Sequence, residues 1–204
     1  MKHKQLLVSI SRGNIKLGSV PNISMVPGSS CPRGVPCLGQ GCYALKAYRL
    51  YNGTRKAWHR NELLAKNHPD SYFMQIAARV ATAKPRLFRW HVAGDILNGD
   101  YLGGMCRIAA ANPGTHFLAF TKAFEIVNRF EDREAIPVNL VLVFSAWPGM
   151  MFSNPNGRHR IAWMQDGTET RVPKDAIECP GNCESCGMCY ELDRLGRDVV
   201  FHKH

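Results

Sequence analysis

The 204-residue chain lacks any apolar stretch long enough to span a membrane. Its longest core-like apolar run, Leu140–Phe144, is far shorter than the roughly 20 residues that a membrane helix needs. The first ten residues, Met1 to Ile10, contain basic side chains but no extended apolar segment and no cleavage site of a secretory signal. We therefore expect a cytoplasmic protein that has no membrane partner.

Acidic residues are scarce in the first half of the chain. Residues 1–102 hold 15 Lys/Arg and 4 Asp/Glu, a net charge of +11, whereas residues 103–204 hold 11 and 12, a net charge of −1. So uneven a distribution favours an acidic partner, such as nucleic acid, for the basic N-terminal half. The basic residues are also scattered along the sequence, so a solvated surface is the alternative interpretation.

The cysteines, in contrast, are abundant and clustered. A cytoplasmic protein keeps its thiols reduced, so eight cysteines indicate metal binding more than disulfides. Seven of them form two groups, and we take these seven as candidate metal ligands: Cys31, Cys37 and Cys42, then Cys179, Cys183, Cys186 and Cys189. The eighth, Cys106, falls within an apolar helical segment and is expected to pack as a small hydrophobe.

The C-terminal group has the spacing C-x3-C-x2-C-x2-C. Soft thiolates select zinc or iron–sulfur clusters, and successive two-residue gaps resemble the runs of ferredoxins, which wrap one corner of a cluster. We therefore predict an iron–sulfur cluster, [4Fe-4S] in type. Zinc and, less favoured, a disulfide knot are the alternatives. The N-terminal group offers three ligands where a cubane usually has four, so water, a substrate, His91 or Cys106 would complete it.

The segments after residue 42 alternate between helix and strand patterns. We expect a helix from Tyr43 to about Lys66, in which Asn52-Gly53 is the candidate break, and further helices over 69–83, 101–111 and 124–130. The expected strands are 5–10, 86–92, 116–121, 140–146, 160–164 and 198–202. Strands joined by helices pair in parallel, so the predicted fold is α/β with a mostly parallel sheet or a partial (β/α) barrel.

One domain is expected over residues 1–204. It would consist of a Gly/Pro-rich loop (1–42), a helix–strand core (43–165) and a Cys-rich C-terminal segment (166–204). Chemistry in such folds collects at the carboxyl ends of the strands. The residues there that we name as catalytic candidates are His91, Asp95 and Lys122. A core histidine and a helix-capping aspartate are the structural alternatives for the first two.

Two resemblances follow from these residues. The segment from Phe88 to Asp95, with Phe117–Lys122 after it, resembles the middle of radical S-adenosylmethionine (SAM) enzymes. That resemblance implies a partial barrel, a cluster on Cys31, Cys37 and Cys42, and cofactor binding by Gly94 and Asp95. The first-loop spacing here is C-x5-C-x4-C, where that family has C-x3-C-x2-C, and this departure counts against a SAM site.

The second resemblance covers nearly the whole chain. The segments Cys42–Lys46, His91–Asp95, Ser145–Pro148, Cys179–Cys183 and Val199–His204 resemble the phage-encoded gene product 88 family. This implies a phage origin and the cytoplasm of a bacterial host, but no reaction. Two classes of function stay open. The first is an iron–sulfur protein that could act as a redox or radical-type enzyme, and the second is a non-catalytic module. The module would be stabilised by a cluster or by zinc, and would bind nucleic acid or a host protein.

Overall fold

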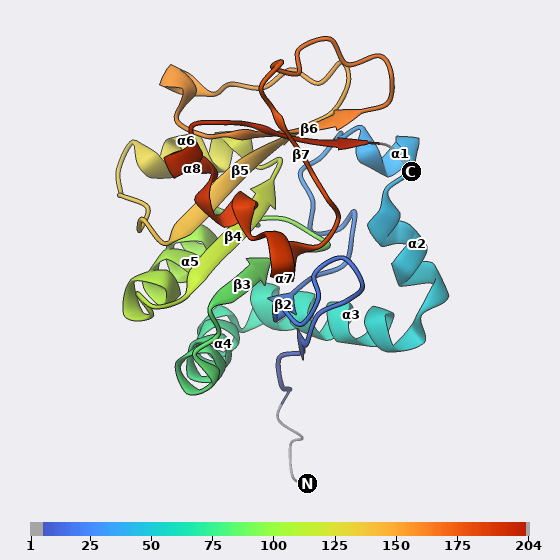
Figure 1. Ribbon diagram of the computed structural model, residues 1–204. Helices are drawn as coiled ribbons and strands as arrows, with labels where there is room; N and C mark the ends of the chain where they lie inside the picture. The colour runs from blue at the N-terminus through green and yellow to red at the C-terminus, as the bar shows by residue number, and fades with distance from the viewer. Residues whose placement is uncertain (1–5, 203–204) are drawn as a thin grey trace, which may run out of the picture.

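A computed structural model describes residues 6–202 as an α/β fold built on one sheet (Figure 1). The strand order is β1-β2-β3-β4-β5-β6-β8-β7, with β1 antiparallel to β2 and every other pair parallel. The sheet is open and does not close into a barrel. The α/β prediction is therefore confirmed. The strands are β1 Ile10–Ser11, β2 Asn22–Ile23, β3 Leu87–Trp90, β4 His116–Thr121, β5 Leu140–Ala146, β6 Ile161–Gln165, β7 Ile177–Glu178 and β8 Val199–His202.

The long helices lie where their periodicity predicted them. Tyr51 adopts an extended conformation and divides the first predicted helix in two, one residue before the expected break at Asn52-Gly53. Proline at residue 69 opens the next helix, because its missing N–H is not needed at a helix start. The helices are α1 Cys37–Gln40, α2 Tyr43–Leu50, α3 Asn52–Asn67, α4 Pro69–Ala83, α5 Gly99–Ala111, α6 Phe124–Glu131, α7 Cys183–Cys186 and α8 Leu192–Leu195, with 3-10 turns η1 Pro155–Gly157 and η2 Met188–Glu191.

Each face of the sheet has its own apolar layer. Helices α3 to α6 pack on one face, where Trp90, Phe117 and Phe144 are fully buried. Cys106 belongs to this helix layer and is 8% exposed, so its predicted role as a packed hydrophobe is confirmed. Within residues 6–202, no helix is long and apolar enough to cross a membrane.

The opposite face is covered by the Cys-rich segment instead of long helices. Leu118, Val141 and Val143 of the sheet pack there against Tyr190 and Leu192, with Cys179, Cys183 and Cys189 at the border. Figure 1 shows this C-terminal segment, coloured red, crossing in front of the strands. A short loop with four thiols therefore occupies the place that a crossover helix would fill in a doubly wound sheet.

Several short elements differ from the sequence predictions. The expected strand 5–10 begins outside the described residues, and the structure places the first strand at Ile10–Ser11. The strands β2 and β7 have two residues each and were not predicted, because so short a segment has no periodicity of its own. Both are held in place by pairing with neighbouring strands.

Candidate functional site

The loop that carries Cys31 is fixed against the carboxyl end of β3. Asp95 N–H donates to the Ser30 carbonyl at 3.0 Å, and Met25 N–H donates to the Ala93 carbonyl at 2.9 Å. Gly94 has a φ of +81°, a left-handed conformation that favours glycine. The predicted cofactor-binding residues Gly94 and Asp95 therefore lie directly against the first cysteine loop.

The three cysteines of this loop are half-buried and lie close to one another. Cys37 begins α1, and Cys42 is the residue before α2. The Cys37 thiol donates a hydrogen bond to the Cys42 sulfur, which raises the pKa of Cys37 and lowers that of Cys42. Cys31 accepts from Gly28 N–H at 3.4 Å, but burial dominates and raises its pKa. The structure thus brings the predicted N-terminal ligands together.

Asp95 joins three chain segments at the carboxyl ends of β3 and β4. Its carboxylate accepts hydrogen bonds from the Thr121 hydroxyl at 2.6 Å, from Lys122 N–H at 2.7 Å and from Ile96 N–H at 2.7 Å. The residue is 5% exposed, and burial raises its pKa although the three donors oppose the shift. Asp95 therefore orients the backbone of Lys122 beside the cysteine loop.

Lys122 is a cation beside the N-terminal cysteines. Its Nζ donates to Ser145 Oγ at 2.8 Å, and its charge favours the thiolate form of Cys31, Cys37 and Cys42. Among residues 6–202, no carboxylate lies within ion-pair distance of this ammonium group. Its charge is thus available to an anionic group on the site.

Cys31 and Lys122 both border an open cleft of about 810 Å³ on the helix side of the sheet. The aromatic rings of Phe73, Tyr101 and Phe124 contribute to its walls. Pockets for small molecules typically measure about 300–1,000 Å³ and combine apolar walls with a few polar groups. The cleft has the size and lining for a small organic ligand next to the three cysteines.

His91, the third catalytic candidate, points into the helix layer. Its Nε2 is 3.0 Å from Tyr101 Oη, which is 2.9 Å from Tyr72 Oη. Its Nδ1 is buried with no hydrogen-bond partner among the described residues. Burial, aided by the charge of Arg89, lowers the pKa of His91 to about 3, so the imidazole is neutral at physiological pH. The hydrogen bond to Tyr101 connects His91 to the cleft wall.

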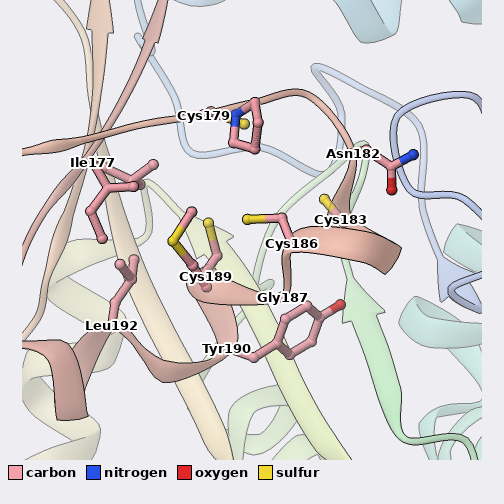
Figure 2. Close-up of a pocket in the computed structure, with 12 residues that line it drawn as sticks. Ile177, Cys179, Asn182, Cys183, Cys186, Gly187, Cys189, Tyr190 and Leu192 are labelled. Atoms are coloured by element: carbon pink, nitrogen blue, oxygen red, sulfur yellow. The ribbon is translucent and has the colours of Figure 1, made fainter.

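The four C-terminal cysteines surround a second, narrower depression (Figure 2). Cys183 and Cys186 are the ends of α7, Cys189 lies in η2, and Cys179 follows β7 directly. Asn182 caps α7 by accepting from Ser185 N–H at 3.1 Å. This cap stabilises the single helical turn whose first and last residues are Cys183 and Cys186.

The Gly-rich N-terminal loop fixes this cysteine segment in place. Cys183 N–H donates to the Lys16 carbonyl at 2.8 Å, and Ser19 N–H donates to Glu184 Oε2 at 2.8 Å. A Cβ at Gly18 would lie 2.2 Å from Glu184 Oε2, so only glycine allows this approach. The C-terminal group is therefore held by contacts that span most of the chain.

All eight cysteines are free thiols in the structure. Burial raises the pKa of Cys183, and raises that of Cys189 to about 12. Across residues 6–202, no three His, Cys, Asp or Glu side chains are arranged to bind one metal ion.

Sequence reasoning missed two residues beside the C-terminal group, Arg89 and Tyr190. Both are buried, and neither belongs to a motif that would have marked it. The one signal was an arginine within the apolar strand Leu87–Trp90. Such a position in a central strand is uncommon for a charged residue, since charged residues are almost never fully buried unless paired.

The family model for gene product 88 matches residues 4–192. The chain belongs to the gene product 88 family. Family membership supports a phage origin, and the matched region includes both cysteine groups. No curated protein and no solved structure matches the chain significantly. The resemblance to radical SAM enzymes therefore has no support from these comparisons.

Proposed function

We propose that this member of the gene product 88 family is an iron–sulfur protein that acts in the cytoplasm of the bacterial host. The C-terminal cysteines would hold a [4Fe-4S] cluster that stabilises the fold. The N-terminal cysteines would hold a second cluster at the carboxyl ends of the strands, where a small ligand binds. Redox or radical-type chemistry on that ligand would be the enzymatic outcome.

The observation that best supports this proposal is the distribution of the cysteines in the fold. Seven half-buried free thiols fall into two groups, on loops and in short helical turns, while the remaining thiol, Cys106, is packed in the core. Thiols that served packing alone would be distributed through the apolar layers, as Cys106 is. Concentrated soft donors are what a thiophilic centre requires.

The donor sets fit clusters better than single ions. Four thiolates on one zinc ion converge within about 2.3 Å of a common point, whereas in a cubane each thiolate binds a different iron and the sulfurs stand further apart. The four C-terminal thiols border one depression, and their spacing of C-x3-C-x2-C-x2-C resembles the runs of ferredoxins. This spacing favours a cluster there, with zinc as the alternative.

The two groups would have different roles. Four cysteines complete the ligand set of a cubane, but three leave one position for another ligand. A cluster on the N-terminal group would supply redox chemistry and a site for an exogenous ligand. Lys122 would hold an anionic group of that ligand, and the rings of Phe73 and Phe124 would contact its body. Asp95 would keep Lys122 in position through its backbone N–H.

The test is an iron and acid-labile sulfide assay on anaerobically prepared protein, with ultraviolet–visible and paramagnetic-resonance spectra. Cys186→Ser should remove the signal of one cluster, whereas the matched substitution Cys106→Ser should leave iron and sulfide unchanged. Stoichiometric zinc without sulfide would overturn the proposal. Retention of the full iron content by both variants would exclude Cys186 as a ligand.

A second candidate function rests on α2 and α3. Both helices carry exposed basic side chains, including Lys46, Arg49 and Arg60, next to the exposed rings of Tyr43 and Tyr51. Basic side chains attract phosphates, and exposed aromatic rings stack on bases. This surface would bind a nucleic acid or another polyanion, independently of any cluster.

A further inference from the structure

Arg89 is a charged residue without a counter-ion. It is 6% exposed, at the centre of the sheet. Its Nε donates to the Trp90 carbonyl at 3.0 Å, and its Cζ lies 4.0 Å from the centroid of the Phe120 ring. Among residues 6–202, no carboxylate lies within 4.0 Å of its guanidinium nitrogens.

These two contacts do not replace what burial removes. A guanidinium group has five N–H donors and a full charge, and a buried charge is normally paired with an anion. One carbonyl and one ring face compensate for only part of the lost hydration. An anionic partner for Arg89 is therefore missing from the amino acids around it.

The side chain projects into the layer that holds the C-terminal cysteines. Phe120, on which it lies, packs in the same cluster as Cys179, Cys183 and Cys189. The charge of Arg89 also acts on Cys183 and Cys189, where it opposes the rise in thiol pKa that burial causes. The thiols of Cys183 and Cys189 are thus among the groups within range of Arg89 that can become anionic.

Tyr190 provides an independent observation at the same place. It lines the depression of the four cysteines, is 3% exposed, and follows Cys189 in the chain. Its hydroxyl is buried and has no hydrogen-bond partner among the described residues. A buried donor without an acceptor is costly, and sulfur atoms that carry negative charge can act as acceptors.

We infer that Arg89 and Tyr190 belong to the C-terminal centre: Arg89 as counter-cation of an anionic, thiolate-ligated metal group, Tyr190 as a hydrogen-bond donor to it. The inference rests on the proposed function to the extent that these cysteines bind metal, but it applies to iron–sulfur and to zinc alike. Neither residue is a ligand. Both are positioning residues that favour a negatively charged centre in an apolar layer.

The experiment compares Arg89→Met with Arg79→Met, an exposed arginine of α4 in the opposite layer. Metal release into a chelator is followed in the anaerobic full-length protein. Loss of the counter-cation should accelerate release on the order of tenfold, the usual effect of removing a group that supports a metal ligand. It should also make the midpoint potential of one cluster more negative, since positive charge near a cluster favours its reduced form. Arg89→Lys should restore most of both properties.

Tyr190→Phe is the second variant, because it removes one hydroxyl and retains the packed ring. It should shift the same potential in the same direction by a smaller amount, while Tyr51→Phe, at the exposed junction of α2 and α3, should shift nothing. This variant keeps the inference testable if Arg89→Met fails to fold.

The outcomes separate the two proposals. Iron and sulfide in the wild type, with equal release rates and potentials in Arg89→Met and Arg79→Met, would overturn the inference and leave the cluster in place. Sulfide-free zinc in the wild type would overturn the cluster, whereas faster zinc release from Arg89→Met would still support the counter-cation. A wild-type protein that holds no metal at all would overturn both.

Discussion

Gly94 and Ser30 approach each other so closely that no side chain fits between them. A Cβ added at Gly94 would lie 2.4 Å from Ser30 Oγ and 3.0 Å from Met25 Cβ. The contact joins the end of β3 to the loop that carries Cys31, and Asp95 N–H reinforces it by donating to the Ser30 carbonyl. The position of the N-terminal cysteines relative to the sheet therefore depends on the absence of a side chain at Gly94.

Gly94→Ala should displace this loop. The substitution combines a clash with a φ of +81°, so we expect a loss of about 1–3 kcal/mol in the free energy of unfolding, measured by urea denaturation. Metal bound by the N-terminal cysteines should be lost before that of the C-terminal group. Gly99→Ala is the control, because nothing lies within 4 Å of its Cβ position and stability should change by less than about 0.5 kcal/mol.

The sequence predicted those parts of the fold whose signal is local. Strands 116–121 and 140–146 were predicted at the bounds that β4 and β5 have, because β-rich apolar runs mark both. The order of the strands and the use of the Cys-rich segment as a covering layer could not be predicted. Both depend on contacts between distant residues, such as Cys183 N–H with the Lys16 carbonyl.

The residues of the candidate site divide in the same way, into those with a local sequence signal and those that depend on the fold. Cysteine spacing identified both groups, and the rule that strand ends meet at one edge placed Asp95 and Lys122 near the first of them. The rule could not tell that His91 points toward Tyr101, because the left-handed backbone at His91, with φ of 54°, reorients the side chain. Arg89 was missed because the sequence does not show that its guanidinium group has no carboxylate partner in the described part of the fold.

The buried His91 should make stability depend on pH. Its pKa falls from an ordinary value near 6.5 to about 3 on folding, so the unfolded chain takes up a proton first as the pH drops. The contribution of His91 is therefore complete above pH 6.5 and declines between pH 6.5 and about 3, by about 1.4 kcal/mol per pH unit. Urea denaturation at pH 7.0 and pH 5.5 measures this slope.

His91→Asn should flatten that slope, because asparagine tolerates the left-handed backbone and does not titrate. The variant should be less stable at pH 7 and nearly pH-independent relative to the wild type. His116→Asn, at the exposed start of β4, should keep the wild-type slope. Equal slopes in all three proteins would show that His91 is not the responsible group.

Removing metal from the C-terminal cysteines should loosen the layer that covers one face of the sheet. Tyr190 and Leu192, 3% and 0% exposed, would lose the support of the centre beside them. After chelation, limited proteolysis should cut first within residues 179–198, while the segment from α4 to α6 stays protected. Simultaneous cleavage of both segments would indicate that the metal supports the whole fold.

Polyanion binding by α2 and α3 should depend steeply on salt. Each phosphate neutralised releases counter-ions, so the triple variant Arg49→Ala, Arg55→Ala, Arg60→Ala should weaken oligonucleotide binding and reduce the salt slope by up to about three. Fluorescence anisotropy with single- and double-stranded probes measures both. Arg129→Ala with Arg133→Ala, on and just after α6, is the control for general charge loss. If no oligonucleotide binds at low salt, the proposal that α2 and α3 bind polyanions is wrong.

The last prediction follows from the proposed cluster on the N-terminal cysteines, where three protein ligands would leave one coordination position open. Cyanide or a small thiol should perturb one of two spectral components in the anaerobic protein, because the four C-terminal cysteines leave no position free. Cys42→Ser should abolish that response, whereas Cys189→Ser should preserve it.

Lys122→Met should keep the iron but weaken the binding of anionic ligands several-fold, since it removes the ammonium group whose charge acts on all three thiols. A neutral ligand such as imidazole should bind wild type and Lys122→Met equally. If replacing Cys31, Cys37 and Cys42 together by Ser leaves iron content and spectrum unchanged, these thiols hold no cluster, and the cleft beside them has no metal centre.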